Sequence, residues 1–107
     1  MVDESIVNII RRYLEVVVAS GIHAEKAILF GSYARGTQRP ESDIDVIVLA
    51  EEFDQNNWEI ENELWRLILK ADTRIQPWGV GIRQYIEDDV SPVIEMARRE
   101  GIEIRRQ

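Results

Sequence analysis

The sequence predicts a small α/β (α+β) domain in which helices pack on one mixed sheet. Three long segments carry apolar residues at helical spacing, and short runs rich in β-branched residues lie between them, bounded by glycine, proline or polar turns. At 107 residues the chain is long enough for one hydrophobic core but not for two. We therefore expect residues 1–107 to form a single domain.

The first helix is expected over residues 4–20. Asp3 suits the N-cap position, where its carboxylate can accept hydrogen bonds from the free amides of the first turn. Apolar residues recur at helical spacing from Ile6 to Val18, which predicts an amphipathic helix packed on a sheet. Gly21 suits the position just beyond the helix, where a left-handed backbone is common.

The remaining elements follow from alternation, helical spacing and turn residues. They are expected in this order: a strand over 26–30, a short helix over 32–35, a strand over 43–49, a polar connector over 51–57, a helix over 58–71, a strand over 74–78, a short helix over 83–90, a helix over 92–100 and a strand over 102–104. Pro77 lacks an amide hydrogen, so it places its strand at a sheet edge or ends it. Gly79 and Gly81 predict a loose loop there, and Ser91-Pro92 is typical of a helix start.

Charge and composition exclude several classes of function. The net charge of −7 argues against a protein that binds nucleic acid by itself. The chain has no cysteine, and its one histidine, His23, is expected at the surface, so thiolate and histidine-rich metal sites are excluded. No apolar run approaches the ~20 residues of a membrane-spanning helix, and the acidic start of the chain does not resemble a signal peptide. We therefore expect a cytoplasmic protein.

Charge is unevenly distributed along the chain. Residues 51–63 include six acidic side chains and no basic one, whereas residues 98–107 include four arginines. Solvated faces are the simpler interpretation, and docking of a partner of opposite charge is the alternative. Trp58 and Trp65 share one helix face, which predicts burial in the core or at an interface, whereas Trp78 is placed to line a pocket or a partner surface.

The most informative residues form two short blocks. Gly31-Ser32 follows the apolar run of residues 27–30, and Asp43-Ile44-Asp45 follows after a gap of ten residues. Alternate side chains of a strand share a face, so Asp43 and Asp45 point the same way, with Cα atoms ~6–7 Å apart. Folding does not require two like charges side by side, where they repel, so the pair indicates a function.

This pattern suits phosphoryl or nucleotidyl transfer. Gly31-Ser32 can offer backbone amides at the start of a short helix, with the serine as its N-cap, and such amides bind anions. Asp43 and Asp45 offer the oxygen ligands that Mg²⁺ prefers, and two such ions lie ~3.5–4 Å apart in two-metal sites. Arg35 or Arg39 can neutralise developing charge. A P-loop is excluded because Gly-Lys-Ser/Thr is absent, and a calcium loop by the apolar residues that follow.

Together the two blocks resemble the signature of the DNA polymerase β-type nucleotidyltransferase superfamily. The fuller string, Gly31-Ser32-Tyr33-Ala34-Arg35-Gly36 with Ser42-Asp43-Ile44-Asp45, is similar to its smallest branch, the minimal nucleotidyltransferase (MNT) domain proteins. The resemblance implies the nucleotidyltransferase fold and a Mg²⁺-dependent transfer of a nucleoside monophosphate, AMP from ATP, to a hydroxyl acceptor.

The resemblance also implies roles and partners. Nucleotide binding would fall to Gly31, Ser32 and Arg35, and catalysis with binding of two magnesium ions to Asp43 and Asp45. Members of this branch occur in HEPN/MNT toxin–antitoxin pairs, in which the minimal protein is an antitoxin that adds AMP to a tyrosine of an RNA-cleaving HEPN toxin. A HEPN-domain protein is therefore the expected partner, without direct contact to nucleic acid or membrane, and pairing of the chain with itself is a further expectation for this class.

One position departs from the family pattern. The superfamily places a third carboxylate on a later strand, and related sequences carry Glu or Asp just before the equivalent of Pro77, where this chain has Gln76. Glutamine is neither an anion nor a base, so it binds a second metal weakly and cannot take a proton from the acceptor. Asp72, four residues earlier, shares that face only if the strand extends so far.

Two interpretations stay open. The chain is either an active nucleotidyltransferase that uses two aspartates, or a binding module that keeps the pocket or the fold and neutralises a partner by occupying it. The presence of Gly31-Ser32, Asp43 and Asp45 favours the enzyme, since a module without catalytic duty needs no adjacent carboxylates. For Arg35, contact with phosphate and a salt bridge that braces the loop are equally open.

Overall fold

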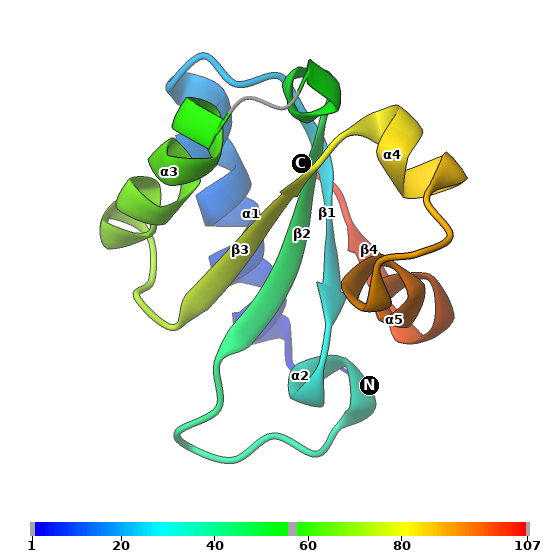
Figure 1. Ribbon diagram of the computed structural model, residues 1–107. Coiled ribbons are helices and arrows are strands. Elements are labelled where there is room, and N and C mark those ends of the chain that lie inside the picture. Colours follow the sequence, from blue (N-terminus) through cyan, green and yellow to red (C-terminus); the bar gives the residue numbers. More distant parts are fainter. Residues whose placement is uncertain (1, 56–57, 107) are drawn as a thin grey trace.

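The computed structural model describes residues 2–55 and 58–106. Its strands are β1 (Ala24–Phe30), β2 (Ile44–Ala50), β3 (Ile75–Val80) and β4 (Ile102–Ile104). They form one sheet in the order β3-β2-β1-β4, with helices on both faces (Figure 1). β2 runs antiparallel to β1 and parallel to β3, and β4 runs antiparallel to β1, so the sheet is mixed as predicted.

The helices form two outer layers. α1 (Glu4–Ala19) and α3 (Trp58–Leu67) pack on one face of the sheet, and α4 (Ile82–Glu87) and α5 (Pro92–Glu100) on the other. The short α2 (Ser32–Arg35) follows β1 directly. Two 3-10 helices, η1 (Glu51–Gln55) and η2 (Ile68–Lys70), follow β2 and α3. This order of elements confirms the predicted fold class.

Local side chains set the helix ends as the sequence indicates. The Asp3 carboxylate accepts a hydrogen bond from Ser5 N at 3.0 Å at the start of α1. Gly21, just beyond α1, has a φ of 104°, which glycine adopts without strain. At the start of α5, Ser91 Oγ accepts a hydrogen bond from Ile94 N at 3.4 Å.

Two segments predicted as loops belong to regular elements, and the burial of Phe53 explains both. The polar connector expected over 51–57 contains η1 instead, because buried Phe53 anchors it against β3; positions 56 and 57 lie outside the described residues. The loose loop expected at Gly79 and Gly81 is also wrong, since β3 continues to Val80. Gly79 makes room for Phe53, because a Cβ at this position would lie 2.5 Å from the phenylalanine ring.

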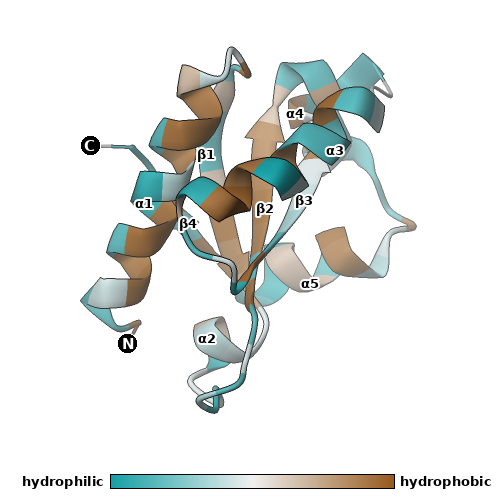
Figure 2. Ribbon diagram, turned by 90° about the vertical axis from the view of Figure 1, so that its left-hand side faces the viewer, coloured by the Kyte–Doolittle hydropathy of each residue, from teal (hydrophilic) through white to brown (hydrophobic). Residues whose placement is uncertain are grey.

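β2 is one of the two inner strands and is buried on both faces. Ile44, Val46 and Val48 pack in the core with α1 and α3, whereas Ile47 and Leu49 pack with α4 and α5, as the alternation predicts. Figure 2 shows the apolar segments of α1 and α3 beside the sheet. β3 lies at a sheet edge, which confirms the expectation from its proline.

The tryptophans belong to neither core. Trp58 is 67% exposed, Trp65 46% and Trp78 40%, so the prediction of core burial for the first two is wrong. The long helix expected over 58–71 is α-helical only to Leu67 and then tightens into η2. Among residues 2–55 and 58–106, no helix has the length and hydropathy needed to cross a membrane.

Candidate active site

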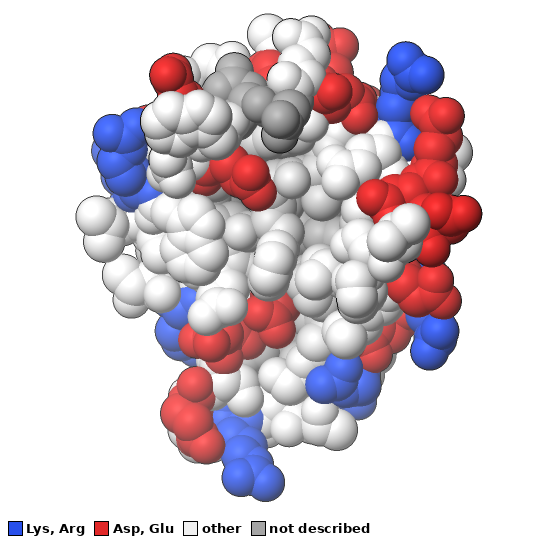
Figure 3. Space-filling view, in the orientation of Figure 1, with Lys and Arg blue, Asp and Glu red and all other residues white. Residues whose placement is uncertain are grey.

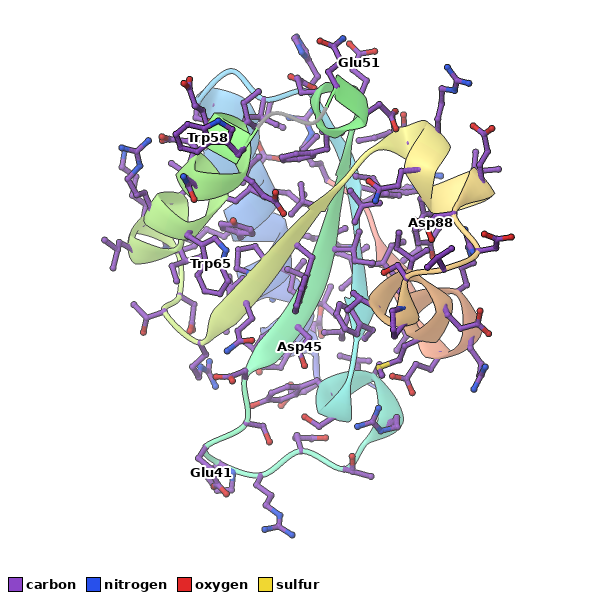
Figure 4. The ribbon with its side chains drawn as sticks, viewed as in Figure 1. Glu41, Asp45, Glu51, Trp58, Trp65 and Asp88 are labelled. Atoms are coloured by element: carbon purple, nitrogen blue, oxygen red, sulfur yellow. The ribbon has the colours of Figure 1, made fainter. Side chains whose placement is uncertain are left out.

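The turn at Gly31 lies directly against Asp45. Phe30, the last residue of β1, is the register partner of Asp45 on β2. Gly31 has a φ of +79°, and a Cβ placed on it would lie 2.5 Å from Asp45 Oδ2, so a larger residue would require a shift. The two blocks that ten residues separate in the chain therefore meet at one end of the sheet, beside α2 (Figure 4).

Ser32 is the first residue of α2 and not its N-cap. Gly31 holds the N-cap position, and its carbonyl accepts hydrogen bonds from Ala34 N and Arg35 N at 3.1 Å each. The predicted N-cap role of Ser32 is wrong because the turn needs a positive φ, which favours glycine. The half-buried Ser32 hydroxyl has no hydrogen-bond partner in the described part of the chain, so it is available to a ligand.

Asp43, Asp45 and Gln76 come together on the neighbouring strands β2 and β3. Asp45 and Gln76 are register partners, and Gln76 Nε2 donates a hydrogen bond to Asp43 Oδ2 at 2.8 Å. Asp43 lies one residue before β2, where the strand was expected to begin. The position of the expected third carboxylate is therefore filled by an amide that binds the first aspartate.

Asp72 does not replace the third carboxylate. β3 begins only at Ile75, so the condition that the strand extends to Asp72 is not met. The Asp72 carboxylate accepts hydrogen bonds from Arg74 N at 2.8 Å, Nε at 3.1 Å and Nη2 at 3.0 Å. These hydrogen bonds lower the pKa of Asp72, whose charge is thus balanced within its own turn.

The environment of Asp45 disfavours the charged form of its carboxylate. Burial raises the pKa of Asp45, the charge of Asp43 raises it further, and Arg35 partly opposes both. A cation between the two aspartates would relieve their repulsion. Their oxygen ligands suit a hard divalent cation such as Mg²⁺.

Glu100, the last residue of α5, contacts the Gly31 turn through its carboxylate. Its Oε1 accepts hydrogen bonds from Gly31 N at 3.1 Å and from Arg35 Nη1 at 2.9 Å, and Arg35 Nη1 lies 3.2 Å from Oε2. Of the two roles left open for Arg35, the structure shows a salt bridge, which Arg35 forms with Glu100. Sequence reasoning missed Glu100, and no local pattern singles it out, because its contacts lie 65 and 69 residues away.

Two other residues considered from the sequence lie outside this cluster. Arg39 has no ion-pair partner in the described part of the chain, and its amide donates to Ser42 Oγ at 2.8 Å. His23 precedes β1, at the opposite end of that strand from Gly31. As expected it is a surface residue, with Nδ1 2.9 Å from Glu52 Oε2.

Comparison with known sequences agrees with this geometry. Residues 10–103 match the nucleotidyltransferase domain family. A candidate protein adenylyltransferase of Methanocaldococcus jannaschii is 42% identical over 72 residues, which cover 58% of this chain and 69% of the relative.

Solved structures share the fold. A candidate nucleotidyltransferase from Sulfolobus solfataricus has a TM-score of 0.65 and 15% identity, over 92% of this chain and 78% of its own. A toxin–antitoxin structure with AMP-PNP has a TM-score of 0.51 and 26% identity, over 91% of this chain and 73% of its own. A structure of the MntA–HpeT toxin–antitoxin mutant gives 0.51 and 23%, over 90% and 72%.

Proposed function

This chain belongs to the nucleotidyltransferase domain family, and we propose that it moves AMP from ATP to a tyrosine of a HEPN-domain toxin and so acts as an antitoxin. The observation that carries the proposal is the close approach of the Asp45 carboxylate to Gly31, which brings the turn proposed to bind phosphate beside the pair proposed to bind a metal. Two comparisons support the finer activity: one relative is named as a candidate protein adenylyltransferase, and one structural neighbour is a toxin–antitoxin with AMP-PNP.

Each residue of the site has a proposed role. The free Ser32 hydroxyl and the amides at the start of α2 bind the triphosphate, and the Gly31 amide and Arg35 would join them on release from Glu100. Asp43 and Asp45 hold Mg²⁺, for which their oxygen ligands and mutual repulsion are suited. Bound magnesium supplies the charge that neutralises the triphosphate.

The composition of the site favours a tyrosine as acceptor. In the reaction, the acceptor oxygen bonds to the α-phosphorus of ATP while the bond from that phosphorus toward the β-phosphate breaks, so pyrophosphate leaves. The hydroxyl proton passes to water, because Gln76 cannot accept it. A tyrosine phenol, with a pKa of about 10, loses its proton far more easily than an aliphatic hydroxyl.

The test is labelling of a purified partner. ATP labelled in the α-phosphate is incubated with Mg²⁺, this chain and the product of the adjacent gene, where the family resemblance places the HEPN-domain partner. We expect label on the partner with the wild type and with Asp72→Asn, a carboxylate variant outside the cluster, but none with Asp43→Asn/Asp45→Asn. No label with the wild type, or equal label with the double variant, would overturn the proposal.

A second candidate function is neutralisation of a partner by binding alone. The hydrogen bond from Gln76 to Asp43 favours it, since this bond competes with a metal for the first aspartate. The two functions differ in their need for ATP. A binding module inhibits the partner with no nucleotide and the inhibition ends when the chain is removed, whereas AMP transfer leaves the purified partner inhibited. Both candidates treat residues 1–107 as one minimal nucleotidyltransferase domain, supported by the single four-stranded sheet; the sheet divides the one core expected from the chain length into two buried clusters, one on each face.

A further inference from the structure

α3 carries an apolar stripe that the fold does not cover. Trp58 and Trp65 are separated by two helical turns, and Leu69, 75% exposed, follows one turn later in η2. A groove of about 420 Å³, lined by Trp58, Glu59, Asn62 and Arg66, lies along the same helix. Large exposed apolar side chains that line up in this way mark interaction surfaces, and tryptophan is the residue most enriched at their centres.

The stripe is additional to the face that α3 uses for folding. Leu64 and Leu67 are buried and pack in the core with α1. Because a helix turns by about 100° per residue, Leu67 projects from the side opposite the two tryptophans, and Leu64 from a side roughly 100–120° away from them. α3 is therefore apolar on two sides, whereas a helix at the surface of a folded domain needs only one apolar side.

The exposed stripe lies beside β3, the edge strand that carries Gln76 of the candidate active site. Trp78 lies two residues after Gln76 on β3, so both side chains share one face of the sheet. Its register partner, Ile47, lies two residues after Asp45. In Figure 4 the Trp65 side chain projects from α3 toward β3, the edge strand that separates α3 from the sheet face carrying Asp45 and Trp78. A partner seated on the tryptophans of α3 would extend around the edge strand β3 to reach the two aspartates.

We propose that Trp58, Trp65, Leu69 and Trp78, together called the tryptophan surface, dock the protein acceptor through a basic, partly apolar face of that protein. The proposal rests on the proposed function and names the surface that brings the acceptor to the site. Figure 3 shows an uncharged centre over β3 and β2 with acidic residues above and below it. The acidic residues of the segment 51–63, among them the exposed Glu59 and Glu61 of α3, supply the charge that a basic partner complements.

Two other occupants fit less well. In a symmetric pair of copies of this chain, the same acidic border would face itself, which repels. A nucleotide is too small, because the stripe from Trp58 to Leu69 runs roughly 16 Å along the helix at 1.5 Å per residue, and one base covers only one aromatic ring. A protein segment matches both the length and the charge.

The test compares two pairs of exposed apolar residues. Trp58→Ala/Trp65→Ala alters the tryptophan surface, and Ile86→Ala/Val90→Ala, at positions 74% and 84% exposed near α4, is the matched control. The product of the adjacent gene is immobilised and binding is measured. We expect the tryptophan variant to bind at least about 100-fold more weakly, with unchanged ATP binding and thermal stability, and the control to bind as the wild type. Glu59→Lys/Glu61→Lys should slow association without removing any apolar contact.

The outcomes separate this proposal from the proposed function. Wild-type affinity in the tryptophan variant overturns the docking surface, even where AMP transfer occurs. A wild-type chain that is a dimer by light scattering, and a tryptophan variant that is a monomer, also overturn it in favour of self-association. If Asp43→Asn/Asp45→Asn binds the partner as tightly as the wild type while the tryptophan variant does not, the surface is supported whether or not AMP is transferred.

Discussion

Gln76 decides how much chemistry the site can perform. Its amide donates to Asp43 at 2.8 Å, so it offers neither charge to a second metal nor a base to the acceptor. We expect Gln76→Glu to raise the rate of AMP transfer on the order of a hundredfold, because a carboxylate here can accept the acceptor proton. Single-turnover transfer to the purified partner at saturating Mg²⁺ measures the change.

Gln76→Ala is the matched control for that prediction. It removes the hydrogen bond to Asp43 without adding a base, so any gain it shows comes from release of the aspartate. An equal gain in both variants would contradict the role assigned to the added carboxylate. A rate that stays at the wild-type level in Gln76→Glu would contradict the view that the third position limits the reaction.

Asp45 makes stability depend on pH in a direction opposite to that of most carboxylates. Its pKa is raised in the folded protein by burial and by Asp43, so the folded state holds its proton more tightly than the unfolded chain. The contribution of Asp45 to the free energy of unfolding therefore falls as the pH rises through the range between the unfolded and the folded pKa. Asp45→Asn should be more stable than the wild type at neutral pH, with a Tm higher by a few degrees.

Urea unfolding at several pH values checks the assignment to Asp45. The advantage of Asp45→Asn should shrink as the pH falls below the ordinary pKa of an aspartate, where the wild-type carboxyl is protonated in both states. Added Mg²⁺ should stabilise the wild type and leave the variant nearly unchanged. A variant that is less stable than the wild type at neutral pH would show that Asp45 contributes a contact that outweighs its desolvation.

At the scale of elements, α5 reaches the nucleotide turn through its last residue. Glu100 accepts a hydrogen bond from Gly31 N and forms an ion pair with Arg35. The Gly31 amide and the Arg35 side chain are two of the groups proposed to bind the triphosphate. Glu100→Gln keeps an acceptor for the Gly31 amide but removes the charge that competes for Arg35. We expect the KM for ATP to fall by up to about fivefold with kcat unchanged, since a partly exposed ion pair such as Arg35–Glu100 contributes roughly 0.2–1 kcal/mol.

Glu100→Ala separates the structural part of this contact from its charge. It also releases Arg35, but it leaves the Gly31 amide without its acceptor, so it should lower the stability by about 1 kcal/mol. Steady-state kinetics and thermal unfolding of the two variants together measure both effects. A rise in the KM for ATP in Glu100→Gln would show instead that the carboxylate holds Arg35 in its working position.

The elements also show what a sequence can and cannot specify. The alternation in β2 is local, so its two buried faces and the side shared by Asp43 and Asp45 could be predicted. The contact of Glu100 with the Gly31 turn could not, because it depends on how α5 packs on the sheet. For Trp58 and Trp65 the sequence left burial in the core and burial at an interface open, because helical spacing alone does not distinguish a stripe that packs in the core from a second apolar stripe at the surface.

For the molecule as a whole, the order of elements and the meeting of the two blocks were accessible from the sequence. Each strand and long helix has its own apolar pattern. The Gly31 turn and the aspartate strand follow one another closely in the chain, and consecutive elements usually lie side by side in the fold. The edge position of β3 followed from its proline. The family resemblance already placed Gln76 at the third position, whereas its hydrogen bond to Asp43 required the structure, because that bond depends on the register between β2 and β3.

Net charge gives a last prediction at this scale. The chain carries −7, with a block of acidic residues around the tryptophan surface, so approach to a basic partner should be steered by long-range attraction. Salt screens such attraction over about 8–10 Å at physiological strength. We expect the association rate constant with the adjacent gene product to fall about tenfold between low and high salt, measured by stopped flow, while the dissociation rate changes little.

Glu59→Gln/Glu61→Gln should associate more slowly at low salt and show a flatter salt dependence. An association rate that salt does not affect would mean that the acidic block is only a solvated face.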